Sequence, residues 1–124
     1  MTNIPTSFML MGDKWEVVVV EDLKNTDHYG ECNHNENKII IHKIVSGQTM
    51  TQSRIEATLY HEVAHAILCA MCRDGLNNDE SFVNILSGLF HQFEITKTIP
   101  SYFRMDGNIN GKSLSEVPKN SPKT

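Results

Sequence analysis

Two histidines and a glutamate, His61, Glu62 and His65, have the residue types and the spacing of a metal site on a helix. They form an H-E-x-x-H pattern inside an apolar stretch, residues 59–68, whose composition favours a helix. Because side chains four residues apart lie on one face of a helix, both imidazoles can reach the same ion. Glu62 projects about 100° further round the helix, where it can act on a metal-bound water without being a ligand.

The donor types of this pattern favour zinc. Two neutral imidazoles and one carboxylate form a three-ligand site that leaves a position open for water. Zinc lowers the pKa of that water toward neutrality, and a carboxylate beside it can take the proton and deliver it to a leaving amine. The pattern therefore predicts zinc-dependent hydrolysis of peptide bonds, with His61 and His65 as metal ligands and Glu62 as the general base and acid.

The third ligand has to come from outside the H-E-x-x-H pattern. The extended metzincin pattern needs glycine at position 68 and histidine at position 71, and this chain has Leu68 and Met71, so that pattern is excluded. Glu80 opens a second apolar helical stretch fifteen residues after His65, beyond a loop long enough to reverse the chain. Asn77 and Glu80 are also spaced as a capping box, so the spacing alone leaves Glu80 either a ligand or a cap.

Other candidate ligands are less well placed in the sequence. Asp74 is only nine residues beyond His65 and would need a sharp reversal of the chain. His91 lies eleven residues after Glu80, about 16 Å along an ideal helix, so these two residues cannot bind the same ion. The other histidines fall in loops or at a strand end, and none of them is individually expected at the site: His28, His34 and His42.

Length, charge and cysteine content limit the class of protein. The 124 residues predict one domain over residues 1–103, followed by a polar segment, residues 104–124, that is expected to be disordered. The formal net charge of −4, with no Lys/Arg cluster, argues against nucleic-acid binding. No apolar run is long enough for a membrane helix, and the N-terminal residues lack a signal-peptide pattern, so no membrane partner and a cytoplasmic location are expected.

A small sheet must position the metal-binding helix. Residues 15–20 and 38–42 have strong strand propensity, and the continuous valines of the first predict burial on both of its faces. Residues 29–33 are expected to pair with residues 38–42 as a hairpin with a four-residue loop. Residues 1–12 are expected to be irregular and residues 46–49 to form a loop, which leaves a three-stranded antiparallel or mixed sheet.

Two helices are expected to pack on this sheet, giving an α+β fold. Ser53 and Glu56 match a capping box at the start of the first helix, which is predicted to continue to about Cys72 and to end near Gly75. The second helix is predicted from Glu80 to about residue 97. One side of the first helix carries an apolar stripe expected to lie on the sheet: Ile55, Leu59, Val63, Ala66 and Ala70. Three cysteines are too few for a disulfide framework, and Cys69 and Cys72 are expected to be packing residues.

The order of these elements and the segment T-L-Y-H-E-V-A-H-A, residues 58–66, resemble the small zincin-like metallopeptidases of bacteria and phages, of which the ImmA/IrrE group is the best-known set. The resemblance covers about residues 15–93. It implies a gluzincin-like site in which His61, His65 and Glu80 hold the metal and Glu62 is the base. It also implies that the strand at residues 38–42 could pair with an extended substrate.

Three functional interpretations follow from the sequence. The first is a zinc metallopeptidase acting on a protein or peptide. The second is a zincin-like domain that keeps the zinc but serves as a regulatory or interaction module with little turnover. The third is a metal-free α+β domain in which the pattern is accidental. No residue can be matched to a transition-state-stabilising group, for which the candidates are Tyr60, Tyr102 and His91. The oligomeric state is left open.

Overall fold

The computed structural model describes residues 4–21 and 26–100. The predicted polar tail, residues 104–124, lies outside these residues, as does Tyr102. The elements in chain order are β1 (Ser7–Leu10), β2 (Asp13–Val20), β3 (Gly30–Asn33), β4 (Lys38–His42), β5 (Ile44–Val45), β6 (Gln48–Thr49), α1 (Gln52–Ala70), α2 (Asp74–Asn77) and α3 (Glu80–Thr96). The predicted α+β class is confirmed.

The main sheet is mixed and has four strands, in the order β1-β2-β4-β3. Strands β2 and β4 run parallel, and the two outer strands run antiparallel to their neighbours. The prediction of three strands is wrong because β1, which was expected to be irregular, pairs with β2. Met11 and Gly12 both adopt positive φ angles of 52° and 85°, as a tight turn between antiparallel strands requires, and Phe8 stacks on Trp15 across the pair.

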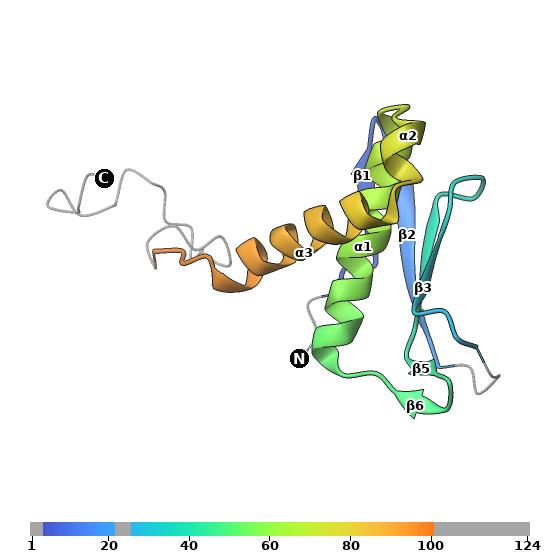
Figure 1. Cartoon of the computed structure of the whole chain (residues 1–124), viewed down its shortest axis with the longest axis vertical. Helices are drawn as coiled ribbons and strands as arrows, with labels where there is room; N and C mark the ends of the chain where they lie inside the picture. Colours follow the sequence, from blue (N-terminus) through green and yellow to red (C-terminus); the bar gives the residue numbers. More distant parts are fainter. Residues whose placement is uncertain (1–3, 22–25, 101–124) are drawn as a thin grey trace, which may run out of the picture.

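Strand β2 is buried on one side only. Trp15 and Val17 lie in the core, whereas Val18 and Val19 are 39% and 40% exposed. The predicted burial of both faces is therefore wrong. Within the described part of the chain, α1 packs against one side of the sheet, so the side chains that point to the other side have no helix to cover them (Figure 1).

Strands β3 and β4 form the predicted hairpin with a loop of residues 34–37. Asn33 Oδ1 shapes the loop by accepting hydrogen bonds from the backbone amides of Asn35 and Glu36, at 2.9 and 3.1 Å. The sheet order places β4 between β2 and β3, so both of its edges are already paired. The expectation that β4 pairs with a substrate is therefore wrong, and β3 is the outer strand on that side of the sheet.

The N-cap of helix α1 lies two residues before the predicted one. Thr51, not Ser53, is the N-cap, and its hydroxyl accepts from the amide of Arg54 at 3.1 Å. At the other end Cys72, not Gly75, takes the left-handed conformation, with a φ of 58°, and Gly75 falls inside α2. Residues 46–49, expected to be a loop, form the turn and the second strand of the small β5-β6 hairpin.

The predicted apolar stripe of α1 forms the core against the sheet. Ile55, Leu59 and Ala66 are buried, with Val63 packed beside them, against residues of β2 and β4 that include Trp15, Val17, Ile39 and Ile41. A second, smaller cluster joins α1 to α3: Ala64, Leu68 and Val83. Figure 1 shows that α3 crosses α1 near the α2 end and then extends away from it. No helix of residues 4–21 and 26–100 is both long and apolar enough to cross a membrane.

Candidate metal centre and cleft

The structure brings His61, His65 and Glu80 together at the crossing of α1 and α3. Glu80 Oε1 lies 3.3 Å from His61 Nε2, and Glu80 Oε2 lies 3.3 Å from His65 Nε2. One donor atom from each of the three residues lies within 4.8 Å of the others. These three residues, the metal-ligand group, can therefore hold a metal ion.

The donor separations are compatible with a tetrahedral metal. For zinc bonds of about 2.0–2.1 Å, tetrahedral ligands lie about 3.3 Å apart, which matches both His–Glu separations. An ion pair would need protonated histidine, but burial, together with the neighbouring His65, lowers the pKa of His61 despite the opposing effect of Glu80. A neutral imidazole is the form that binds a metal.

Helix capping explains why Glu80 is free to act as a ligand. The N-cap of α3 is Asp79, whose Oδ1 accepts from the amide of Phe82 at 3.1 Å. Asn77 is the last residue of α2 and does not cap α3. The capping-box alternative for Asn77 and Glu80 is therefore wrong. Helix α2 and the following turn reverse the chain and bring the first residue of α3 beside the histidines.

Asn77 instead contacts the ring nitrogen of His65 that is not directed at Glu80. Its Oδ1 lies 2.6 Å from His65 Nδ1 and can accept the proton of that nitrogen. This contact selects the tautomer of His65 whose Nε2 lone pair points toward Glu80 and is available to a metal. The sequence contains no signal for this role, because the asparagine lies in a loop-like segment and reads there as a cap.

We expect Asn77→Ala to weaken zinc binding by about 10- to 100-fold without unfolding the protein, because His65 loses the contact that orients its ring. Titration of the metal-free protein against a competing zinc chelator measures the change. Asn78→Ala, at the exposed neighbouring C-cap of α2, is the control and should bind zinc as tightly as the wild type. Equal affinity in Asn77→Ala would contradict the supporting role.

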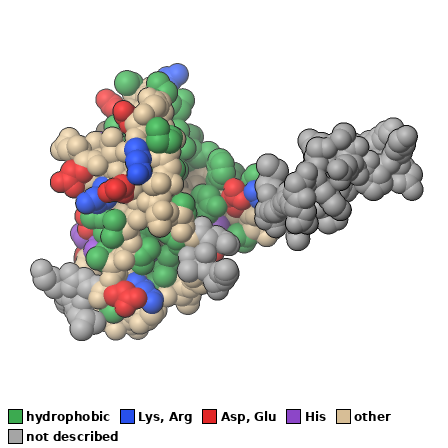
Figure 2. All heavy atoms as spheres, turned by 180° about the vertical axis from the view of Figure 1, so that it is seen from behind, with side chains coloured by type: hydrophobic (Ala, Val, Ile, Leu, Met, Phe, Trp, Pro, Cys, Tyr) green, Lys and Arg blue, Asp and Glu red, His purple; other side chains and the backbone are tan. Residues whose placement is uncertain are grey.

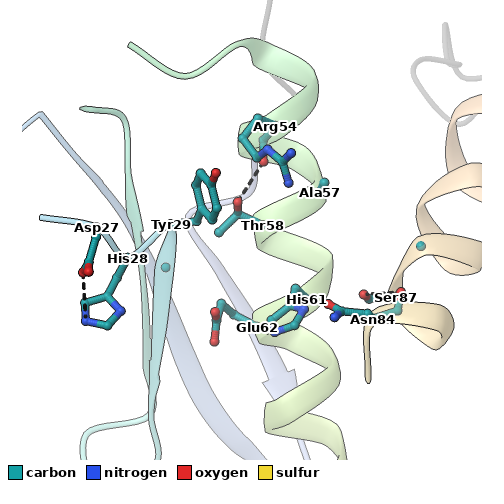
Figure 3. Close-up of a pocket in the computed structure, with 12 residues that line it drawn as sticks. Asp27, His28, Tyr29, Arg54, Ala57, Thr58, His61, Glu62, Asn84 and Ser87 are labelled. Carbon is teal, nitrogen blue, oxygen red and sulfur yellow. Dashed lines mark hydrogen bonds and ion pairs between the residues drawn. The ribbon is translucent and has the colours of Figure 1, made fainter. Parts of the chain in front are cut away.

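Asn84, one turn beyond Glu80 on α3, supports the other histidine. It partly offsets the lowering of the His61 pKa by burial, and Figure 3 shows its side chain pointing at that ring from α3. Each of the two histidines thus has an asparagine side chain beside its ring. Neither asparagine was identified as a candidate from the sequence, since both depend on how α2 and α3 return to α1.

Glu62 lies on the sheet side of α1, close to the start of β3. It is only 8% exposed, and its carboxylate makes no hydrogen bond or ion pair with another described residue. Gly30 permits this close approach: a Cβ there would lie 2.6 Å from Thr58 Cγ2 and 3.2 Å from Glu62 Cγ. Burial raises the pKa of Glu62 to about 7, with opposing contributions from His65, which lowers it, and from Glu80, which raises it.

This raised pKa predicts how metal-free protein stability varies with pH. Between pH 4.5 and 7 the folded state holds the Glu62 proton more tightly than the unfolded chain does, so stability falls as the pH rises through that range. Removing the carboxylate in Glu62→Gln should then stabilise the chelated protein by about 3 kcal/mol above pH 7 and by nothing below about pH 4.5. Urea unfolding at pH 4.5 and pH 8 measures both differences; an equal difference at the two pH values would contradict the assignment.

A cleft of about 480 Å³ opens beside the metal-ligand group. Figure 3 shows its three walls, which are the segment leading into β3, one face of α1 and one face of α3. His61 and Glu62 line the cleft, and the other lining residues are Asp27, His28, Tyr29, Gly30, Arg54, Ala57, Thr58, Asn84, Ser87 and Gly88. An attacking water held between the ligands and Glu62 would therefore be accessible from this cleft.

Of the other candidate residues, His28 lines the cleft, whereas Asp74 and His91 lie elsewhere. Asp74 is in α2 and is not part of the metal-ligand group. His91 pairs with Glu56 at 3.3 Å and stacks on Tyr60, with ring centroids 5.1 Å apart, and neither ring lines the cleft.

The cysteines divide between packing and exposure. Cys32 packs against the core, and burial raises the pKa of its thiol to about 12. Cys69 is half-buried, but Cys72 is exposed, so the expectation that Cys72 packs is wrong. It occupies the left-handed turn that follows α1.

Comparison of the chain with protein-family models, with curated proteins and with solved structures gives no match. The chemistry of the site is therefore inferred from its own residues.

Proposed function

We propose that this chain is a zinc-dependent metallopeptidase of zincin-like fold, with a gluzincin-type site. The observation that carries the proposal is the convergence of His61, His65 and Glu80 at zinc-like separations beside a buried, unpaired carboxylate, that of Glu62. Two imidazoles and one carboxylate are a catalytic donor set, because a fourth position stays open. When bound, zinc would polarise a substrate carbonyl and acidify a water molecule.

Glu62 would act as the proton carrier. Its position one residue after His61 places it on the neighbouring face of α1, and the cleft gives a substrate access to both side chains. A carboxyl whose pKa lies near neutrality is suited to taking a proton from water and returning it to the leaving amine. A bound zinc ion would lower the pKa of Glu62. On the acid side of the pH profile, the rate of hydrolysis should therefore begin to fall only at a pH below about 7.

The substrate is proposed to be an extended peptide lying along β3. That strand pairs with β4 on one side, and no described strand pairs with its other edge. The β3 edge adjoins Glu62 through Gly30, so a peptide added to the sheet there would pass the metal-ligand group. Backbone hydrogen bonding of this kind selects an extended conformation rather than a particular sequence.

The test is cleavage of an unstructured protein such as reduced casein by zinc-loaded protein, by chelated protein and by chelated protein to which zinc has been returned. We expect cleavage only in the first and third cases, with zinc near one ion per chain. Zinc binding without cleavage of any unstructured substrate would favour the second candidate. The absence of zinc binding would exclude both.

The second candidate is a zinc-binding regulatory or interaction module of the same fold. One observation favours it: Tyr60 and His91, candidates for transition-state stabilisation, stack on each other outside the cleft. Such a module would keep the zinc and the peptide-binding edge of β3 but would turn over slowly. Binding of a non-hydrolysed peptide, without loss of substrate, is its expected signature.

A further inference from the structure

Helix α3 turns its most apolar side away from its own protein. The residues that it buries, Val83 and Ser87, lie on the side facing α1, as does the His91–Glu56 pair. With 100° per residue, the centre of its apolar side lies about 120° round the helix from this contact. Ile85, Leu89 and Phe93 are 60–62% exposed on that side. The need to direct Glu80 and Asn84 at the histidines of α1 accounts for this orientation.

The apolar side of α3 has the spacing of a helix-pairing seam. Phe82, Leu86, Leu89 and Phe93, the seam, follow one another at intervals of four, three and four residues, the four-three alternation of a heptad repeat, which keeps one stripe facing a partner helix. Phe82 is partly buried at the start of the seam, whereas the following residues are open to solvent. A lone helix of this length in a folded domain normally buries such a stripe.

A groove runs beside the seam, between α1 and α3, on the side away from the metal-ligand group. Its volume is about 860 Å³, and its walls are largely apolar side chains that include Tyr60, Val63, Ile67, Leu86, Phe90 and Ile95. Figure 2 shows hydrophobic side chains gathered where α3 leaves the body of the molecule. The seam and the groove are therefore continuous, since Leu86 belongs to both.

We propose that this seam and groove are covered by a second copy of the chain, in a two-fold dimer whose α3 helices pack antiparallel. One surface supplies both an apolar helix and an apolar groove, which is the self-complementarity that a two-fold interface needs. Antiparallel packing also opposes the two helix dipoles favourably and places Leu89, at the middle of the seam, against Leu89 of the second copy.

The exposed apolar area is sufficient for such a dimer. Seven side chains of the groove and of the apolar side of α3 are each 36–62% exposed: Ile67, Ile85, Leu86, Leu89, Phe90, Phe93 and Ile95. At about 100 Å² each they offer on the order of 700 Å² per copy, close to the roughly 800 Å² per partner of a standard interface. A membrane surface fits less well, because Lys97, the cation that lies over Phe93 of this stripe, is already paired with Glu94 at 2.7 Å and is less available to anionic lipid.

Light scattering during gel filtration of the full chain, over a range of protein concentrations, tests the proposal. We expect a mass twice the 14.0 kDa of the chain for the wild type and a single-chain mass for Leu89→Lys. The dimer dissociation constant should rise by at least about 100-fold in that variant, since a desolvated charge replaces a central contact. Far-UV circular dichroism shows whether the variant is folded, and Phe93→Lys repeats the test at a second seam position.

Met11→Lys is the matched control. It removes an 84% exposed apolar side chain and adds the same charge, but it lies in the β1–β2 turn, away from α3. It should leave the dimer intact. A single-chain mass for the wild type at every concentration, a dimer that survives both α3 substitutions, or equal dissociation in Met11→Lys would each overturn the proposal. So would binding of single wild-type chains to phosphatidylcholine–phosphatidylglycerol vesicles or to an added amphipathic helix, which would assign the surface to another occupant.

Discussion

Glu62→Gln is expected to lower kcat for peptide hydrolysis by about 10³-fold, within the range of a lost general base, while the protein still binds about one zinc ion per chain. Glutamine preserves the size of the side chain beside Gly30 but cannot accept the proton of the attacking water. The loss should therefore appear in kcat with little change in KM, because the substrate-binding edge of β3 is untouched.

The measurement is the initial rate on a fluorogenic or unstructured protein substrate, together with the zinc content of the same sample. Glu56→Gln is the matched control: it lies on the same helix and is half-buried, but it faces His91 outside the cleft. This control should keep the wild-type rate. Equal rates in wild type and Glu62→Gln, at equal zinc content, would remove Glu62 from the mechanism and leave the interaction module as the better interpretation.

Removal of a metal ligand should have the second large effect. We expect His65→Ala and Glu80→Ala each to weaken zinc binding by at least about 10³-fold, because a site with three protein ligands retains only two. The Glu80 side chain is 62% exposed, so its removal should leave the fold intact and isolate its effect on the metal. Competition against a zinc chelator, with circular dichroism on each variant, measures both quantities.

Glu94→Ala is the control for Glu80→Ala. It removes the same side chain from the same helix, fourteen residues further on, where the carboxylate pairs with Lys97 at 2.7 Å. Zinc affinity should be unchanged in this variant. If Glu80→Ala also bound zinc as tightly as the wild type, then Glu80 would be an exposed first-turn glutamate of α3 and a different third donor would be required.

The elements with local signals were predicted well from the sequence. The H-E-x-x-H spacing depends only on the helical repeat, so the pairing of His61 and His65 on one face of α1 could be derived before any fold was known. The strand at residues 38–42 and the end of α3 near residue 97 were also correct, because dense β-branched residues and the approach of Pro100 are local features.

The predicted ends of α1 were wrong because two nearby residues at each end could have taken the same capping role. Thr51 and Ser53 can both cap α1, and Cys72 and Gly75 can both follow it. Which residue acts depends on the direction in which the chain approaches and leaves, and tertiary packing decides that direction. The four-residue strand β1 was missed for a related reason, since it is stabilised by pairing with β2 rather than by its own composition.

The sequence by itself therefore determined the chemistry of this protein's candidate site: two imidazoles on one helix face, a carboxylate beside them and a short list for the third donor. Only the tertiary structure decided that Glu80 joins the two histidines, that Asn77 and Asn84 contact their rings, and that β3 rather than β4 is the outer strand. The physical reason is the separation, along the sequence, of the residues that make the deciding contacts. A helical repeat is set by neighbouring residues, whereas the return of α3 onto α1 and the order of the strands depend on contacts between distant segments.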